Sequence, residues 1–243
     1  MNDMKKSVAM TAVMALAVMF TAQAQDLDKI LDNHFKAIGQ KNLQKIQTLK
    51  ATGNAVMMGM EVPFSMQTKR PGMVRTEVEV QGAKIIQVYD GENAWAVNPL
   101  MGSSMAMDLT GIEAEGLREN ADLDGQLWNY EEKGHQLSVE GDDEVNGKEC
   151  YVLKLDKKNG QTDYYYIDKE NYLIRQLGIS RPVNGAPMEV EVLLSDYRDV
   201  DGYKMPFVTE QRSGGQTFMT LKMDQAEANV ELDDSLFSKP SGN

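Results

Sequence analysis

The sequence predicts a mainly β protein in which antiparallel strands are interrupted once by helices. Residues 74–81 alternate between apolar and polar side chains, as in a strand with one buried and one solvated face. Turn dipeptides such as Asp90-Gly91 and Asn146-Gly147 recur along the chain and favour antiparallel hairpins. The long gap between these two turns contains helix-like segments. These three observations indicate a β meander with one helical insert.

The stretch at residues 69–102 organises this pattern. A strand at 74–80 is followed by the turn Gln81-Gly82 and by a second strand at 84–89. A third strand is expected at 92–97, and Asn98-Pro99 ends it because proline has no amide donor for the ladder. The stretch therefore predicts a three-stranded antiparallel meander.

More strands are expected on both sides of the meander. Strands at 48–60 and 62–68 precede it, and Gly53 and Gly59 permit a bend in the first. After the gap, strands are expected at 136–145, 148–156, 161–168, 172–180, 188–197, 203–211 and 216–224.

Helices are expected before the first strand and within the gap. Residues 26–38 carry apolar side chains at helical spacing, with Asp26 to cap the start and Gly39 to end the helix. Short helices are expected at 112–123 and 126–132, whereas the Met- and Ser-rich residues 100–107 show no clean period. We expect the tail at 229–240 to dock on the sheet.

The first 24 residues have the features of a secretory signal peptide. Lys5 and Lys6 precede an apolar run at 8–20 that is short for a membrane span, and Ala22-Gln23-Ala24 resembles a cleavage site. The next residue is Gln25 rather than cysteine, so no lipid anchor is expected there. We therefore expect cleavage after Ala24, a soluble periplasmic protein, and a single domain at residues 25–243.

Charge and composition exclude several classes of function. The formal net charge is −12, and it becomes −13 without residues 1–24, which carry two lysines and one aspartate. No Lys/Arg-rich run follows, so binding to nucleic acid or to an anionic membrane is not expected. The single cysteine, Cys150, excludes an intramolecular disulfide and lies in an apolar run typical of a buried residue.

The sequence offers little material for catalysis or metal binding. It contains two histidines and neither a G-x-S-x-G nor an H-E-x-x-H motif. Residues 142–147 resemble the start of a calcium loop, but the twelfth position is Leu153 where glutamate is needed, so a hairpin turn is expected. We assign no catalytic residue, no metal site and no cofactor, and we expect a non-enzyme.

Four features of the meander, in their order and spacing, resemble the periplasmic lipoprotein-carrier (LolA-like) family. They are Arg70-Pro71, Asp90-Gly91, Trp95 and Asn98-Pro99. The resemblance implies an incomplete, strongly bent antiparallel β-barrel whose helical lid covers an apolar cavity for acyl chains. It also implies acylated lipoprotein or lipid cargo, an inner-membrane donor, an outer-membrane acceptor and a monomeric carrier in the periplasm.

Flexible apolar side chains, several of them methionines, form the candidate cargo-binding site. Twelve methionines remain after the leader, and methionine suits surfaces that accept variable apolar shapes, although ordinary core filling is the simpler alternative. Shared parity on successive strands places several residues on one concave face. The candidate cavity residues are Met58, Met60, Val62, Phe64, Met66, Val78, Trp95, Val190, Val192 and Leu194.

Arg70 shares the parity of Phe64 and Met66, which places a permanent cation on the apolar side. One interpretation is a strand-end arginine that reaches water. The other is a latch to backbone carbonyls of a covering element, which the resemblance favours. The insert at 100–132 is the expected source of those carbonyls.

Two other functions are compatible with the pattern. The same fold serves as a lipid-sensing or protein-interaction module of the cell envelope, and fold does not decide function. A secreted hydrolase would need a convergent polar cluster in a pocket, and no such cluster stands out in the sequence.

Overall fold

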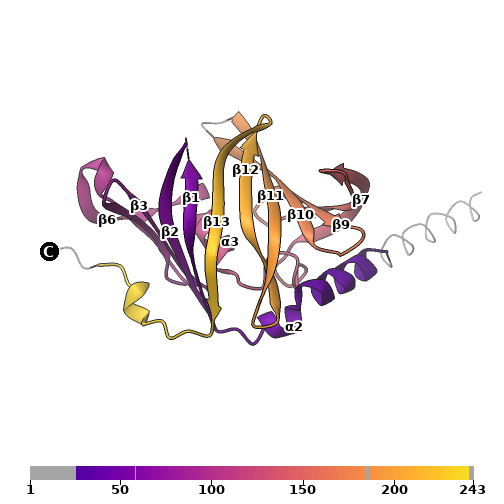
Figure 1. The fold of residues 1–243 in the computed structure, drawn as a ribbon, viewed down its shortest axis with the longest axis horizontal. Coiled ribbons are helices and arrows are strands. Elements are labelled where there is room, and N and C mark those ends of the chain that lie inside the picture. Colours follow the sequence, from indigo (N-terminus) through magenta and orange to yellow (C-terminus); the bar gives the residue numbers. More distant parts are fainter. Residues whose placement is uncertain (1–25, 58, 184–185, 241–243) are drawn as a thin grey trace, which may run out of the picture.

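The computed structural model describes residues 26–57, 59–183 and 186–240. Within these residues, thirteen strands form one antiparallel sheet (Figure 1). The strands are β1 (Thr48–Met57), β2 (Met60–Lys69), β3 (Met73–Val80), β4 (Ala83–Tyr89), β5 (Ala94–Asn98), β6 (Ser103–Leu109), β7 (Gln136–Val145), β8 (Lys148–Asp156), β9 (Thr162–Asp168), β10 (Ile174–Val183), β11 (Ala186–Val200), β12 (Tyr203–Ser213) and β13 (Gln216–Ala228).

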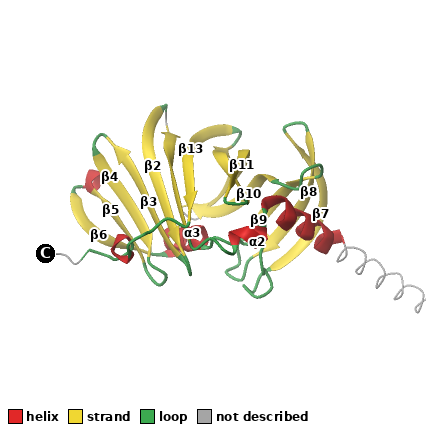
Figure 2. Ribbon diagram, turned by 60° about the horizontal axis from the view of Figure 1, so that its bottom comes forward, coloured by secondary structure: helices red, strands yellow, loops and turns green. Residues whose placement is uncertain are grey.

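The sheet is not closed, and its two edge strands are β6 and β7. The strand order is β6-β5-β4-β3-β2-β1-β13-β12-β11-β10-β9-β8-β7. The chain therefore starts in the middle of the sheet, reaches one edge, crosses to the other edge and returns to pair β13 with β1. Figure 2 shows the sheet bent around the segments that cover it, as the family resemblance implies.

Three helical segments and a run of turns cover one face of the sheet, which we call the inner face. They are the helix at residues 26–38, the short α2 (Gln40–Leu43), α3 (Gly111–Ala121) and the turns at 123–134. The helix at 26–38 buries Leu27, Ile30 and Leu31 against β8 and β9. Leu117 and Ala121, four residues apart on α3, pack against Val74 and Ala94.

The crossing segment at 110–135 runs across the inner face from one edge of the sheet to the other. Its first part, α3, packs on β3 and β5. Leu123 then contacts the cluster around Leu49 and Met205, and Leu127 packs against Leu153 of β8. Because one connection joins the two edge strands, it must lie over the face between them.

At Gly53 the backbone of β1 lies close to the backbone of β13. The register of this pair shifts between Thr52 and Gly53. A Cβ on Gly53 would lie 2.0 Å from the carbonyl oxygen of Lys222, so no larger residue fits without moving β13. A register shift of this kind is one way in which a strand accommodates the bend that Gly53 permits. Gly59 instead lies in the turn between β1 and β2. The first strand therefore ends at Met57, whereas the sequence predicted that it extends to residue 60.

The structure differs from the sequence analysis in two places between residues 100 and 132. Residues 100–107 lie in the 3-10 helix η1 (Pro99–Met101) and in strand β6. The sequence did not reveal this strand, because Ala106 between Met105 and Met107 is apolar too and leaves no apolar–polar alternation. Residues 126–132 form successive turns rather than a helix, with Asn129 in the left-handed region (φ 51°). The helix expected at 112–123 is present as α3.

The opposite, outer face is covered near β4 and β5 by the C-terminal tail. Phe237 and Leu232 pack against Trp95 and Val88, and the tail includes the 3-10 helix η2 (Asp234–Leu236). Thr48 Oγ1 donates a hydrogen bond to the carbonyl of Val230 (2.6 Å) at the start of the tail. The predicted docking of the tail on the sheet is confirmed. No helix among the described residues combines the length and the apolar character needed to cross a membrane.

The tail should contribute measurably to stability through Phe237, whose side chain is only 1% exposed. Phe237→Ala should lower the free energy of unfolding by about 3–5 kcal/mol, because it removes buried apolar area and leaves a cavity. Urea denaturation followed by circular dichroism measures this loss. Phe218→Ala is the matched control, because Phe218 is 40% exposed. Equal losses for the two variants would show that the tail does not stabilise the sheet.

Candidate functional site

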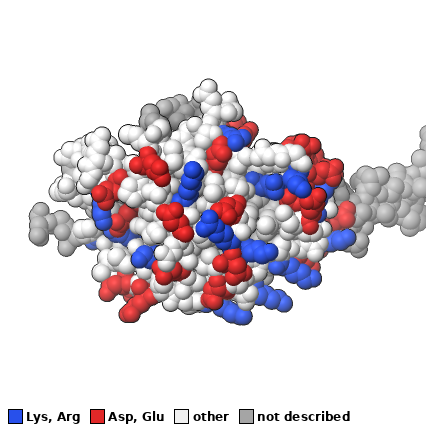
Figure 3. Space-filling view, viewed as in Figure 1, with Lys and Arg blue, Asp and Glu red and all other residues white. Residues whose placement is uncertain are grey.

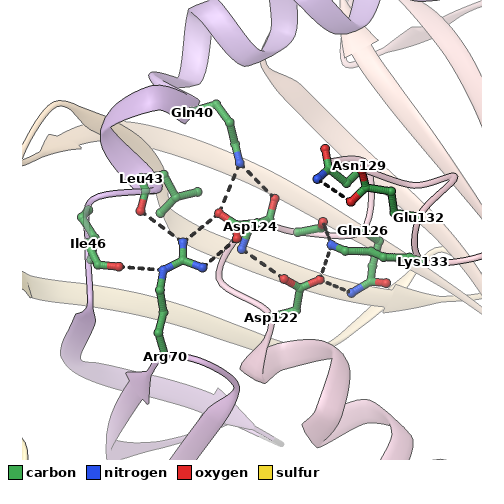
Figure 4. Close-up of polar contacts among 11 residues, drawn as sticks. Gln40, Leu43, Ile46, Arg70, Asp122, Asp124, Gln126, Asn129, Glu132 and Lys133 are labelled. Atoms are coloured by element: carbon green, nitrogen blue, oxygen red, sulfur yellow. Dashed lines mark hydrogen bonds and ion pairs between the residues drawn. The ribbon is translucent and has the colours of Figure 1, made fainter.

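Arg70, at the end of β2, lies where the sheet meets two covering segments. Its Nε donates to the carbonyl of Ile46 (2.8 Å) and its Nη2 to the carbonyl of Leu43 (3.2 Å) (Figure 4). Nη1 and Nη2 also donate to the two carboxylate oxygens of Asp124, at 2.6 and 2.7 Å. The side chain thus joins the sheet, the turn after α2 and the crossing segment.

The Arg70–Asp124 pair is bidentate, which is the geometry in which arginine binds carboxylates most strongly. Both side chains are 21% exposed, so solvent screens the pair only in part. The hydrogen bonds to Asp124 raise the pKa of Arg70 above its ordinary value, against the opposing effect of burial. Gln40, which is buried, donates a longer bond of 3.4 Å to the same carboxylate. The two side chains are therefore strongly paired in this conformation.

The structure corrects the predicted partner of Arg70. We expected backbone carbonyls of the insert, but the insert contributes the side chain of Asp124, and the carbonyls belong to Leu43 and Ile46. The sequence held a signal for this, since Asp122-Leu123-Asp124-Gly125 places acidic residues in the loop of the insert. A buried cation is better satisfied by a carboxylate than by carbonyls alone.

A second set of bonds holds the Asp124 loop in shape. Lys133 Nζ donates to Asp122 Oδ2 (2.5 Å) and to the carbonyl of Gly125 (2.7 Å). Asp122 also accepts from the amide nitrogen of Asp124 (3.2 Å) and from Gln126 Nε2 (3.1 Å). Figure 4 shows these groups on the side of the loop away from Arg70. The loop is thereby held so that Asp124 points at the arginine.

A cavity of about 230 Å³ lies between the helix at 26–38, the Asp124 loop and the sheet. Leu194, Tyr197 and Tyr203 line it on the sheet side, and His34 on the helix side. Burial lowers the pKa of His34, whose Nδ1 lies 2.8 Å from the carbonyl of Tyr172, and burial raises the pKa of Tyr203 to about 12. Both side chains are therefore neutral near pH 7.

Most of the predicted cavity residues lie on the inner face. Phe64 on β2 pairs directly with Val78 on β3. The register across β1, β13 and β12 relates Val62 to Leu194 on β11 through Ala55, Leu221 and Thr209, so the two share a face. By the same alternation this face carries Met60, Met66, Val190 and Val192. The inner face is thus apolar on both sides of the β1–β13 pair.

Two predicted cavity residues do not join this set. Trp95 pairs with Val88, which pairs with Arg75, so Trp95 lies on the outer face under the tail. Its predicted place on the concave face is wrong, because parity within one strand does not fix the face of a neighbouring strand unless the turn between them is known. Met58 lies outside the described residues. Met60 is half exposed, at the end of β2 far from Arg70.

Comparison with known proteins rests on structure, since no family model and no curated protein matches the sequence. A DUF1329 family protein from Desulfovibrio piger has a TM-score of 0.60 at 14% identity, covering 86% of this chain and 97% of its own. A putative outer membrane lipoprotein-sorting protein domain from Vibrio parahaemolyticus has a TM-score of 0.55 at 12% identity, covering 83% and 95%.

A LolA superfamily protein from Nitrosomonas europaea is also similar, with a TM-score of 0.54 at 14% identity, covering 83% of this chain and 98% of its own. The fold is LolA-like. Identities this low establish the architecture of the LolA-like sheet and its covering segments, as the sequence predicted, and they leave the function to be argued from the site.

A second contact ties the crossing segment to the LolA-like sheet. Lys157, between β8 and β9, has a side chain that is 2% exposed and pairs with Asp163 (2.5 Å) and with Glu119 of α3 (2.6 Å). Arg70 and Lys157 thus hold the segment at two places. The described residues contain no group of three or more His, Cys, Asp or Glu side chains arranged to hold a metal ion.

The Arg70–Asp124 pair should control the local opening of the crossing segment. Asp124→Asn keeps the size of the side chain but removes its charge, which should cost about 1.5–3 kcal/mol of local stability. Amide hydrogen exchange at residues 122–127 should then be faster by about 10- to 100-fold. Asp108→Asn, which breaks an exposed ion pair with Lys239, is the control. Unchanged exchange in Asp124→Asn would contradict a structural role for the pair.

Proposed function

We propose that this protein is a non-enzymatic periplasmic carrier that binds acyl chains of lipoproteins or related lipids and moves them toward the outer membrane. One observation carries the proposal. The inner face bears apolar side chains on β2, β3 and β11, and several of them are only partly buried, although Val62 and Val192 are buried. Phe64, Val78 and Val190 are among the half-buried ones.

An acyl chain is a suitable occupant for such a surface. Each methylene that leaves water contributes roughly 0.8 kcal/mol, so a long chain would gain much from covering the inner face. Met60 and Met66 lie on this face, and methionine side chains adapt to apolar groups of varied shape. A surface of this kind suits acyl cargo that differs from one molecule to the next.

Two further observations support the proposal. One structure of similar fold is described as a putative outer membrane lipoprotein-sorting protein domain, and that description applies to the Vibrio protein itself. In this chain, residues 1–24 have the sequence pattern of an export signal. A carrier between two membranes would need both an exported chain and an apolar surface.

Arg70 would act as a latch in this scheme. With the inner face empty, Arg70 holds the Asp124 loop and the turn after α2 against the end of the sheet. Cargo that extends along the inner face toward Arg70 would have to displace the loop and break these bonds. Their re-formation would then oppose tight retention of cargo and assist its release.

The proposed binding surface is tested by a charge at its centre. Phe64→Glu should weaken binding of a fluorescent fatty acid by about tenfold or more, because a carboxylate on an apolar surface loses solvation when the chain covers it. Fluorescence titration of the purified protein measures the affinity. The matched control is Gln67→Glu on the outer side of the same strand, opposite Arg75. Equal binding by folded Phe64→Glu and wild-type protein would show that the inner face is not the binding site.

Mass spectrometry of lipids extracted from native protein would identify the cargo.

The latch is tested by the rate of release. Arg70→Leu removes the donors and keeps an apolar side chain, so the closed state should lose about 1.5–3 kcal/mol. The fatty acid should bind more tightly and dissociate about 10- to 100-fold more slowly. Stopped-flow displacement measures the dissociation rate, and Asp124→Asn should change it in the same direction. An unchanged rate in both variants would reduce Arg70 to a structural residue.

A further inference from the structure

An open groove of about 380 Å³ lies where the end of the N-terminal helix meets α2 and the turns of the crossing segment. Phe35 and Trp128 supply its apolar part. Their rings meet edge to face with centroids 4.9 Å apart, and both side chains are only half-buried. Lys36 and Lys41 line the groove beside them. The groove thus combines an aromatic surface with two cations, and it shares only Phe35 and Gln40 with the lining of the 230 Å³ cavity.

The lysines at the groove belong to a stretch of sequence without acidic residues. Residues 33–60 contain four lysines and neither aspartate nor glutamate, although the whole chain carries a net charge of −12. Lys36, Lys41 and Lys45 are exposed, and none of them forms an ion pair with another described residue. In Figure 3, blue side chains gather along the lower right edge of the molecule, where Figure 1 places the N-terminal helix and α2. Asp32 is the one carboxylate among the described residues that line the groove, so the balance of charge there is positive.

The backbone that carries these lysines is held against the turn between β11 and β12. Gly39 adopts a φ of 76°, and a Cβ there would lie 2.1 Å from the carbonyl oxygen of Gly202, so only glycine permits this close approach. Asn42 Nδ2 donates to the same carbonyl at 3.0 Å. A partner would therefore meet a segment that is already in place, and binding would not have to order it.

Charge and shape together indicate what fits this groove. Half-buried aromatic rings favour an apolar group of a partner, and exposed lysines without ion pairs favour its anionic groups. An anionic membrane fits less well, because the chain as a whole is strongly acidic and the two rings line a groove. A segment of protein can place one side chain in the groove while its carboxylates reach the lysines. The rest of the acidic surface repels such a segment and so directs it here.

We propose that this groove is the docking site for an acidic segment of a partner protein. An apolar side chain of the segment lies against Phe35 and Trp128, and its carboxylates lie at Lys36, Lys41 and Lys45. The role of that partner, as a donor or acceptor of cargo, rests on the proposed carrier function, whereas the docking itself does not.

The groove adjoins the contacts of Arg70. Gln40, which lines the groove, donates to the carboxylate of Asp124 (3.4 Å). The carbonyls of Leu43 and Ile46, which accept from Arg70, lie on either side of Lys45 in the sequence. A docked partner would therefore touch the same turn that Arg70 holds.

Docking is tested with labelled peptides and fluorescence anisotropy on the purified protein. The first peptide holds one phenylalanine among four glutamates, the second replaces the phenylalanine by alanine, and the third replaces the glutamates by glutamines. The first peptide should bind within a titration to about 1 mM, and added salt should weaken this binding because the lysines are exposed. The second and third peptides should bind several-fold more weakly, since each lacks one of the two kinds of contact. Trp128→Ala should bind the first peptide about as weakly as the wild-type protein binds the second.

The place of docking is tested by charge reversal. Lys36→Glu/Lys41→Glu should weaken binding of the first peptide by about tenfold or more, because two attractions become repulsions. The matched control is Lys158→Glu/Lys222→Glu, which changes the net charge equally at exposed positions outside the groove and should alter binding by less than about twofold. Circular dichroism checks that each variant is folded.

Three results of the peptide titrations overturn the proposal. They are no binding of the first peptide by the wild-type protein, equal binding of the first and second peptides, and equal losses in the two charge-reversed variants. Binding of the wild-type protein to phosphatidylglycerol vesicles in place of the peptide also overturns it, and would assign the lysines to a membrane. None of these titrations uses the inner face, so a failure of fatty-acid binding and a failure of peptide docking are distinguishable.

Discussion

The permanent charge of Arg70 is the constraint on which the covering of the sheet depends. A guanidinium at the end of β2, on the apolar side, cannot stay there without acceptors. The fold brings them from two directions: carbonyls from the turn after α2 and a carboxylate from the crossing segment. One side chain therefore contacts both the N-terminal segments and the crossing segment at the end of β2, and the cavity beside Asp124 lies where these segments meet.

The open sheet and its single crossing connection explain why the covering is incomplete. A segment of about two dozen residues cannot cover thirteen strands. It covers the strand ends near Arg70, where Leu117, Leu123 and Leu127 pack in succession. The opposite ends of the same strands keep half-buried apolar groups such as Phe64 and Val78. The distribution of apolar surface is thus set by topology as well as by composition.

Local patterns in the sequence were sufficient for most of the elements. The helix at 26–38 and the hairpin strands follow from spacing and turn residues within a few positions of each other. The face of Trp95 could not be predicted in this way, because it depends on pairing across the turn after β4. Strand β6 was missed because Ala106 hides the alternation of its neighbours. Asp124 was missed as the partner of Arg70 because the two lie 54 residues apart and only the crossing of the sheet brings them together.

The pairing of β1 with β13 has a consequence for how the molecule assembles. Every other pair of adjacent strands is a hairpin between sequence neighbours, while Leu49 meets Ala228 across almost the whole described chain. Loop closure over such a distance is slow compared with hairpin formation. The two halves of the sheet, β1 to β6 and β7 to β13, can each form from local hairpins. The pairing of β1 with β13 that joins them can form only after the last strand is present. When the chain is synthesised or exported with its N-terminus first, the centre of the sheet is therefore the last part to be completed.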